Sequence, residues 1–272
     1  MAIWSKDFTL LKNNIVETKP LVHHITNYVT SGDCANVALC FGASPVMADE
    51  LEEIDAMTGA AKALVLNIGT INQTKLTSML RAAEVARSRQ IPIIFDPVGV
   101  MASSFRQKAA QQILRDGVSI IRGNYAECRC LLGDASFGQG VDSQALSDGQ
   151  GKFAAKAAQQ FGCVVAVTGA LDAISDGQTT ILATNGVELL TKVTGTGCMT
   201  TTLIACAAAV SMEYLPAAVF GITAMNVAAE KAAVQLRAGE GPGTFKAKLF
   251  DQIYNLSGDD IAVAFRGVGQ NA

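Results

Sequence analysis

Residues 194–198 have the sequence Thr-Gly-Thr-Gly-Cys and lead directly into a stretch without charged residues that ends at Met212. Glycines next to small hydroxylated residues let backbone N–H groups converge. The uncharged stretch predicts a buried helix whose first turn carries unpaired N–H donors and the positive end of the helix dipole. The segment therefore predicts an anion-binding site. Cys198 lies at its mouth, where a thiol acts as a nucleophile, as a weak base or only as a packing group.

Polar residues follow four apolar runs that we interpret as buried strands, at residues 63–68, 91–95, 118–121 and 164–167. In parallel α/β sheets, ligands bind outside the carboxyl ends of the strands. The polar residues at these ends include Asn67, Asp96, Arg122, Asn124, Glu127 and Thr168. Each alone is typical of strand-end turns and helix caps, but together with the glycine-rich segment they predict one shared site.

Two of these residues, Asp96 and Glu127, are carboxylates that would repel an anion unless a cation lies between them and the anion. Mg²⁺ does this in phosphoryl transfer, where one or two carboxylates hold it together with the phosphates. Arg122 and Thr168 add donors suited to phosphate oxygens. The set predicts a nucleoside triphosphate with Mg²⁺. The pattern GxxxxGK[ST] does not occur in the sequence, which disfavours a P-loop fold.

The N-terminal segments 20–27 and 42–47 are mostly apolar with a few polar groups, which is typical of a pocket for a small, partly apolar ligand. Asn27 can donate and accept hydrogen bonds there, and Met47 can pack against a flat ring. We interpret His23 and His24 as buried, hydrogen-bonded side chains, because no further ligand at metal-site spacing accompanies them.

The predicted strands alternate with helical patterns at residues 75–89, 105–115, 125–132 and 151–161. This alternation predicts an α/β fold of three layers, in which helices cover both faces of a mainly parallel central sheet. No linker divides the chain, so we expect residues 1–272 to form a single domain.

An antiparallel edge is predicted after the last parallel strand. Residues 171–175 and 179–183 flank the turn signal Asp176-Gly177, and residues 187–193 provide a further predicted strand. Residues 133–150 are the long predicted loop. The C-terminal third is predicted to be helical, at residues 198–212, 216–236 and 244–256.

Composition excludes several functions. Half of the 272 residues are apolar and 17% are charged, which suits a large packed core. The net charge of −3 and the lack of a Lys/Arg cluster argue against nucleic-acid binding. The first ten residues include Lys6 and Asp7, so we expect no secretory signal and a cytoplasmic protein. Glycines and threonines interrupt the uncharged run 193–212, which indicates a loop and a buried helix rather than a membrane span.

The seven cysteines are an odd number scattered through apolar segments, and we interpret most of them as small buried hydrophobic residues. Cys128 and Cys130 have no second Cys/His pair nearby. We therefore predict no structural metal.

Six motifs, in order along the chain, resemble those of the hydroxyethylthiazole kinase family, a branch of the ribokinase-like superfamily. They lie at residues 21–27, 42–47, 63–70, 96–99, 121–124 and 194–198 and cover nearly the whole chain. Asn124 and Glu127 also match the Asn-x-x-Glu element by which the superfamily organises Mg²⁺ and phosphates. The resemblance implies a ribokinase-like fold and ATP-dependent phosphorylation of the primary alcohol of 4-methyl-5-(2-hydroxyethyl)thiazole, in thiamine biosynthesis and salvage.

Site residues are carried over from the same resemblance, position by position. Asn27, Met47 and Gly195 are expected to contact the thiazole. Arg122, Thr168 and Asn124 are expected to contact ATP. Asp96 and Glu127 are expected to bind Mg²⁺. The family is also similar to homotrimers with active sites between subunits. The resemblance therefore implies a homotrimer.

Most of the superfamily ends the glycine loop in an Asp that serves as base. Cys198 takes that position here, as is common in the thiazole kinase branch. A cysteine of ordinary pKa, about 8.5, is mostly a thiol at neutral pH. Phosphoryl transfer depends mainly on positioning and electrostatic stabilisation. We therefore expect a modest contribution from Cys198, whereas the N–H groups around Gly195 and Gly197 contribute about 100-fold or more per donor.

Three other functions stay open. A thiol hydrolase or phosphatase would use Cys198 as a covalent nucleophile, but such sites need an activating His or Arg, and the first Arg after Cys198 is Arg237. A kinase for hydroxymethylpyrimidine or pyridoxal would share the fold and the anion site. A non-catalytic nucleotide sensor would bind ATP without turnover, but the presence of Asp96, Glu127 and the glycine loop favours catalysis.

Overall fold

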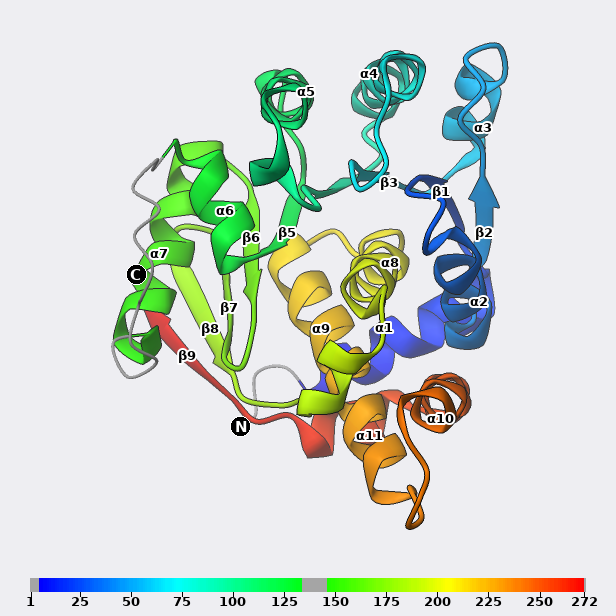
Figure 1. The fold of residues 1–272 in the computed structure, drawn as a ribbon, viewed down its shortest axis with the longest axis vertical. Helices are drawn as coiled ribbons and strands as arrows, with labels where there is room; N and C mark the ends of the chain where they lie inside the picture. The colour runs from blue at the N-terminus through cyan, green and yellow to red at the C-terminus, as the bar shows by residue number, and fades with distance from the viewer. Residues whose placement is uncertain (1–4, 134–145, 272) are drawn as a thin grey trace.

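The computed structural model describes residues 5–133 and 146–271 of the chain. Within these residues, nine strands form one sheet in the order β2-β1-β3-β4-β5-β6-β7-β8-β9 (Figure 1). The strands are β1 (Leu21–Ile25), β2 (Ser44–Met47), β3 (Ala63–Asn67), β4 (Ile93–Asp96), β5 (Ile120–Asn124), β6 (Val164–Thr168), β7 (Asp172–Ser175), β8 (Thr179–Ala183) and β9 (Gly267–Asn271). Neighbours from β2 to β6 pair in parallel, and those from β6 to β9 pair antiparallel. The mainly parallel sheet with an antiparallel edge is confirmed.

Helices cover both faces of the sheet, which confirms the three layers (Figure 1). One face carries α3 (Ile54–Ala60), α4 (Gln73–Ser88), α5 (Ser104–Arg115), α6 (Tyr125–Leu131) and α7 (Leu146–Phe161). The other face carries α1 (Ser5–Thr18), α2 (Ser31–Phe41), α8 (Thr196–Ala208), α9 (Tyr214–Val234), α10 (Pro242–Asn255) and α11 (Gly258–Ala264).

The parallel strands are apolar throughout because both of their faces are buried. Along β3, Ala63 and Val65 pack into the core on the side of α8 and α9, whereas Leu64 and Leu66 pack into the core on the side of α4. Successive side chains of a strand point to opposite faces of the sheet. The apolar runs that predicted these strands therefore reflect two cores, one on each side.

The strand predicted at residues 187–193 is wrong. Residues Glu188–Lys192 form the 3₁₀ helix η2, none of whose residues is buried. Its ends are joined by an ion pair between Lys192 and Glu188 at 3.4 Å, a spacing of four residues that suits a helical turn. The free edge of β8 pairs instead with β9, near the C-terminus.

The predicted helices are confirmed with shifts of a few residues at their ends. α7 begins at Leu146, five residues before its predicted start, and shortens the predicted loop 133–150. The rest of that loop falls mainly on residues 134–145, which lie outside the described residues. Of the two N-terminal segments predicted to form a pocket, residues 20–27 contain β1 and the residues on either side of it, and residues 42–47 contain β2 and the two residues before it.

α9 is long and apolar enough to cross a membrane, but 78% of its most apolar window is buried inside the molecule. It packs closely against α8 at Gly221, where an added Cβ would lie 2.5 Å from the backbone nitrogen of Ile204. These features are typical of a helix in the core of a globular domain.

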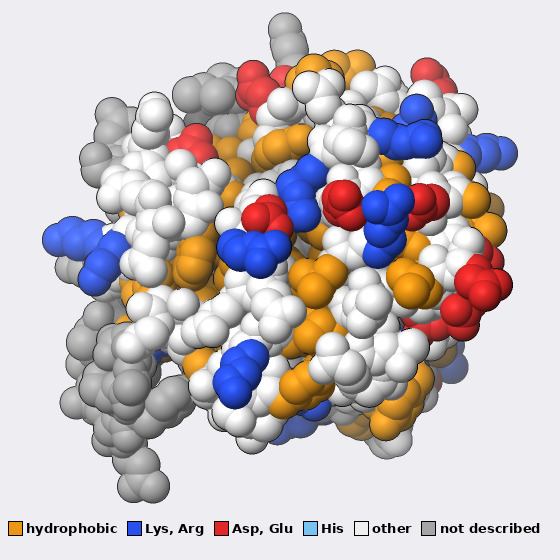
Figure 2. Space-filling model, turned by 90° about the horizontal axis from the view of Figure 1, so that it is seen from above, with side chains coloured by type: hydrophobic (Ala, Val, Ile, Leu, Met, Phe, Trp, Pro, Cys, Tyr) orange, Lys and Arg blue, Asp and Glu red, His pale blue; other side chains and the backbone are white. Residues whose placement is uncertain are grey.

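The outer surface of the α3–α5 layer carries both signs of charge. Figure 2 shows Lys and Arg side chains interspersed with Asp and Glu over the centre of this face, and a group of acidic side chains at its right edge. Arg81 of α4, for example, pairs with Asp55 of α3 and with Glu84.

Candidate active site

Polar side chains converge at the carboxyl edge of the parallel strands. The last residues of β3, β4, β5 and β6 are Asn67, Asp96, Asn124 and Thr168. α8 begins at the same edge, since Cys198 in its first turn contacts both Asn67 and Asn27, which follows β1. The structure thus brings together the residues that the strand ends predicted.

The first turn of α8 begins at Gly195 without a side-chain cap. Gly195 has a left-handed backbone with φ of 90°, and an added Cβ would lie 2.6 Å from Cγ2 of Thr30. An added Cβ at Gly197 would collide with the guanidinium of Arg122. Position 195 therefore requires glycine, whereas at Gly197 the flexible end of the Arg122 side chain would have to move. The uncapped helix start presents N–H donors that can bind an anion.

The thiol of Cys198 is buried and held by two amides. Its Sγ accepts hydrogen bonds from Nδ2 of Asn27 at 3.4 Å and from Nδ2 of Asn67 at 3.3 Å. Burial raises the pKa of the Cys198 thiol, and the nearby Asp96 carboxylate raises it further. The side chain is thus a thiol at neutral pH. Covalent catalysis would need a thiolate and an activating His, whereas Nε2 of His24 pairs with Thr202 at 3.2 Å.

Asp96 is fully buried at the end of β4. Its Oδ2 accepts hydrogen bonds from Nδ2 of Asn67 at 3.0 Å and from Oγ1 of Thr201 at 2.8 Å. Its Oδ1 is buried and has no partner within the described residues. Burial raises the pKa of Asp96 to about 6, an effect that Arg122 opposes and Glu127 reinforces. A buried carboxylate oxygen without a partner is a place where a cation or a water would bind.

Glu127 and Asn124 form a capping box at the start of α6. Oδ1 of Asn124 accepts a hydrogen bond from the backbone N–H of Glu127, and Oε2 of Glu127 accepts one from the N–H of Asn124, both at 2.9 Å. Oε1 of Glu127 accepts another from the N–H of Gly99 at 3.0 Å. Glu127 thereby ties the loop after β4 to α6, and each of its oxygens retains a further lone pair.

Arg122 lies between the strand ends and α8. Its Nη2 donates a hydrogen bond to Oγ1 of Thr168 at 2.6 Å. Its Nε is buried and has no partner in the described part of the chain. An unpartnered guanidinium N–H next to a helix N-terminus strengthens the anion site.

Arg122, Asn124 and the start of α8 line a pocket of about 490 Å³, a volume that suits a small-molecule ligand. Its walls come from the ends of β5 and β6, from the first turn of α8, from the segment 185–191 that includes η2, and from α9. The lining residues from β5, β6 and α8 are Arg122, Asn124, Thr168, Thr196, Gly197 and Thr200.

Asn27 and Met47, predicted to contact a substrate, differ in how much of each side chain is free to contact a ligand. Nδ2 of Asn27 also donates to Oδ1 of Asn67 at 3.1 Å, and Oδ1 of Asn27 accepts from the backbone and hydroxyl of Thr30, both at 3.0 Å. All hydrogen-bonding capacity of the Asn27 side chain is therefore used inside the protein. Met47, at the end of the edge strand β2, is 38% exposed.

His23 and His24 are confirmed as buried and hydrogen-bonded. The ring nitrogens of His23 pair with Thr58 and with the carbonyl of Ala48, and those of His24 pair with the carbonyl of Val22 and with Thr202. Burial lowers the pKa of both rings, that of His24 to about 4. Both are neutral at pH 7.

Two residues contribute contacts to the site that the sequence did not assign to them, although Asn67 was among the strand-end residues predicted to meet there. Asn67 joins Cys198, Asp96 and Asn27 through one amide, and its position at a strand end was the available signal. Thr201 lies three residues after Cys198 on the predicted helix, which places both side chains on one face. That spacing was the signal available for Thr201.

The fold and the site define a class of protein. A ribokinase-like superfamily protein from Enterococcus faecalis has the same fold, with a TM-score of 0.62 at 13% identity over 90% of this chain and 89% of that one. The chain is thus ribokinase-like in fold, and it carries an uncapped helix start beside a buried carboxylate at the carboxyl edge of the sheet.

Within this class, the chain belongs to the hydroxyethylthiazole kinase family, whose family model matches residues 12–259. A hydroxyethylthiazole kinase from Alkaliphilus metalliredigens is 46% identical over 244 residues, which are 89% of this chain and 90% of that protein. The structure of a hydroxyethylthiazole kinase protein from Pyrococcus horikoshii has a TM-score of 0.89 at 38% identity and covers 97% of this chain and 99% of that one. The resemblance seen in the six motifs is confirmed.

Proposed function

We propose that this chain transfers the γ-phosphoryl group of ATP to the primary alcohol of 4-methyl-5-(2-hydroxyethyl)thiazole, as a cytoplasmic enzyme of thiamine biosynthesis and salvage. The observation that supports this most directly is the uncapped start of α8 beside Asp96, whose Oδ1 is buried without a partner in the described residues. Membership of the hydroxyethylthiazole kinase family identifies the acceptor alcohol.

The first turn of α8 would bind the transferred phosphoryl group. Backbone N–H groups at the helix start, around Gly195 and Gly197, are fixed before the reaction and would stabilise the charge that develops on that group. Arg122 would add a charged donor. Asn124 and Thr168 line the same pocket and would contact ATP.

Cys198 would position the alcohol rather than remove its proton. Burial keeps the Cys198 side chain a thiol at neutral pH, so it cannot accept a further proton. The amides of Asn27 and Asn67 fix its sulfur. In phosphoryl transfer the proton of the nucleophile leaves late, which makes a strong base unnecessary.

Asp96 and Glu127 fit a divalent cation by their chemistry. Both are carboxylates at one edge of the sheet, and Mg²⁺ prefers oxygen ligands supplied by one or two carboxylates, waters and phosphates. When bound with ATP, Mg²⁺ would neutralise phosphate charge. Asp96 would approach it through Oδ1, and Glu127 would hold the adjacent loop through its bond to Gly99.

Asn27, Met47 and Gly195 would form the thiazole side of the site, and a second copy of the chain would complete it. Exposed apolar side chains near Met47 support a subunit contact at this edge; they are Tyr28, Val29 and Leu51. We propose a homotrimer of single-domain subunits, each formed by residues 1–272, which sedimentation velocity can test.

The function is tested by ADP release with the thiazole alcohol, with and without Mg²⁺. ADP release is expected to require both, and EDTA should abolish it until Mg²⁺ is restored. Pyridoxal and hydroxymethylpyrimidine are the comparison alcohols, and a higher kcat/KM with either would overturn the assigned substrate. ATP binding without acceptor-dependent ADP release would identify a nucleotide sensor instead.

A further inference from the structure

The wall of the 490 Å³ pocket formed by α9 and the segment 185–191 has no role in the proposed phosphoryl transfer. Three of its side chains are apolar, Val187, Leu190 and Ile222, and can cover the face of a flat ring. Several polar side chains line the pocket with them, and two of these, Asp172 and Asn226, pair with each other. This combination resembles a site that holds an aromatic group and fixes its orientation by a few polar contacts.

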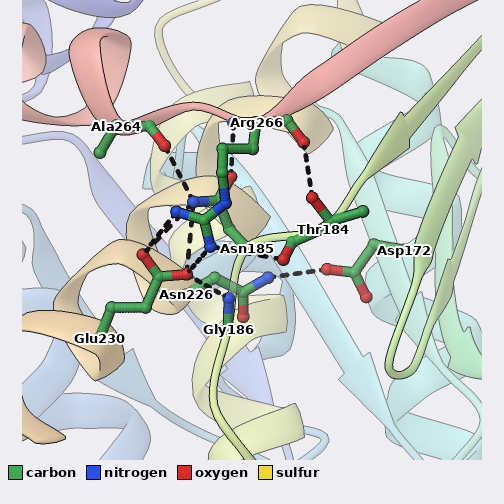
Figure 3. A network of polar contacts seen from close by, with 8 residues as sticks. All are labelled: Asp172, Thr184, Asn185, Gly186, Asn226, Glu230, Ala264 and Arg266. Carbon is green, nitrogen blue, oxygen red and sulfur yellow. Dashed lines mark hydrogen bonds and ion pairs between the residues drawn. The ribbon is translucent and has the colours of Figure 1, made fainter.

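Asp172 and Asn226 form a direct pair, as Figure 3 shows. Nδ2 of Asn226 donates a hydrogen bond to Oδ2 of Asp172 at 2.7 Å, and the backbone N–H of Gly169 donates to Oδ1 of Asp172 at 2.9 Å. The exposed fractions of Asp172 and Asn226 are only 3% and 8%. Asp172 therefore accepts from both sides in a site nearly closed to solvent.

This pairing fixes the orientation of the Asn226 amide. Burial raises the pKa of Asp172 to about 6, so at pH 7.5 the group is a carboxylate, which can only accept hydrogen bonds. Asn226 must then turn its NH₂ group toward Asp172 and its Oδ1 away. Within the described residues, Oδ1 of Asn226 accepts no hydrogen bond, although Asn226 lines the pocket.

The backbone beside Asn226 is held in place as well. An added Cβ at Gly186 would lie 3.4 Å from Oδ1 of Asn226, so the two residues are neighbours. The N–H of Gly186 donates to Oε1 of Glu230, one turn further along α9, at 2.6 Å. The acceptor thus lies on a rigid helix beside an anchored loop, which suits selective recognition.

We propose that Oδ1 of Asn226 accepts a hydrogen bond from the nucleoside part of the bound triphosphate and thereby selects the nucleotide, and that Asp172 is the positioning residue that sets this acceptor. The proposal rests on the proposed function, because it places a nucleoside triphosphate in the pocket. The donor is an N–H of the base or a hydroxyl of the ribose.

The test uses nucleotides that each lack one donor. KM and kcat are measured at saturating thiazole alcohol and pH 7.5 with ATP, purine riboside triphosphate, 2′-deoxy-ATP and 3′-deoxy-ATP. We expect Asn226→Ala to raise the KM for ATP about five- to tenfold with kcat changed less than twofold, the effect of one lost hydrogen bond. For the analogue that lacks the contacted donor, wild type and Asn226→Ala should have the same KM.

Asp172→Asn keeps the shape of the side chain. Because the N–H of Gly169 holds the oxygen of residue 172, the new NH₂ group faces Asn226, which must turn its Oδ1 toward residue 172 and its own NH₂ group away. It should therefore lower discrimination between ATP and that analogue, which a merely structural role would not do. The matched control is Thr223→Ala, because Thr223 is buried on the same helix, its hydroxyl donates to the carbonyl of Val219, and it is not among the described residues that line the pocket. Its nucleotide selectivity should equal that of wild type.

Equilibrium binding of the same nucleotides without the alcohol separates this proposal from the proposed function. Selective ATP binding without turnover would refute the kinase assignment and leave the role of Asn226 intact. Turnover with an unchanged ATP KM in Asn226→Ala, or with equal changes for all four nucleotides, would refute the role of Asn226. No nucleotide binding at all would refute both.

Discussion

At the scale of single residues, the site is organised by amides rather than by charges. Asn67 donates to both Asp96 and Cys198, and its Oδ1 accepts from Asn27 and from the N–H of Gly69 at 2.9 Å. One carboxamide therefore sets the position of the buried carboxylate and of the thiol. Burial raises the pKa values of the Asp96 carboxyl and the Cys198 thiol. The protein environment therefore sets the protonation states of both groups.

The division of work between backbone and side chain can be measured with two substitutions. Gly195→Ala should lower kcat about 100-fold or more, because its left-handed backbone with φ of 90° is strained for any residue with a Cβ and the new Cβ collides with Thr30, which displaces the N–H groups of the first turn. Cys198→Ala should lower kcat about tenfold or less, because only positioning by a neutral thiol is lost. Steady-state kinetics with ATP and the thiazole alcohol provide both values.

Gly243→Ala in α10 is the matched control for the glycine change. Apart from its chain neighbours and the nearby backbone of its own helix, no heavy atom of the described residues lies within 4 Å of an added Cβ at Gly243, and its φ is not left-handed, so kcat should stay at the wild-type value. A loss of kcat in Cys198→Ala as large as that in Gly195→Ala would show that the thiol contributes as much to catalysis as the backbone N–H groups.

At the scale of elements, the segment that joins β8 to η2 depends on one side chain of α9. Glu230 accepts hydrogen bonds from the N–H of Gly186 and from both terminal nitrogens of Arg266, which precedes β9 (Figure 3). Asn185 adds a bond from its Nδ2 to the carbonyl of Ala264 at 2.9 Å. One wall of the pocket is thereby attached to α9 and to the C-terminal segment.

Glu230→Gln tests this attachment. The neutral amide loses charge-assisted bonds to Arg266, so the free energy of unfolding should fall by about 1–3 kcal/mol. Because the wall of the pocket loosens, the KM for ATP should rise while kcat changes little. Urea titration and steady-state kinetics measure the two effects.

The control for Glu230→Gln is Arg115→Gln on α5, since Arg115 makes an exposed ion pair with Asp116 far from the pocket. It should change neither quantity measurably. Unchanged stability in Glu230→Gln would show that the segment is held by its other contacts.

The same region shows where prediction from the sequence succeeds and where it fails. The parallel strands could be predicted because two buried faces make each of them apolar throughout. β9 has the sequence Gly-Val-Gly-Gln-Asn, without an apolar pattern, and is a strand only because the edge of β8 needs a partner. Residues 187–193 carry apolar residues but no such edge, so they fold into η2.

For the site, topology was the predictive principle. Asn67, Asp96, Asn124 and Thr168 were found because strand ends meet at one edge. The pair of Asp172 and Asn226 could not be found, because 54 positions separate the two residues and each alone is an ordinary turn or helix residue. The roles of the predicted site residues stay predictions, which the kinetic variants test.

At the scale of the whole molecule, two sets of buried groups act on stability in opposite directions as the pH changes. Asp96 and Asp172 have pKa values raised to about 6 by burial, so they stabilise the fold below about pH 4, and this contribution is lost as the pH rises through 6. His23 and His24 have pKa values lowered by burial, that of His24 to about 4. Between pH 4 and 6.5 the unfolded chain binds more protons at these histidines, so their contribution to stability rises with pH.

Replacing the two carboxyls should expose the contribution of the histidines. Each raised carboxyl is worth up to about 3 kcal/mol over this range, at about 1.4 kcal/mol per pKa unit. We expect the free energy of unfolding of the ligand-free wild type to change little between pH 4.5 and 6.5. That of Asp96→Asn/Asp172→Asn should rise by several kcal/mol over the same range. Urea titrations at four pH values measure both slopes.

Asp55→Asn is the control, because the pKa of exposed Asp55 is lowered and its titration falls below this range. Equal slopes in the double variant and the wild type would show that the buried carboxyls do not offset the titration of the histidines.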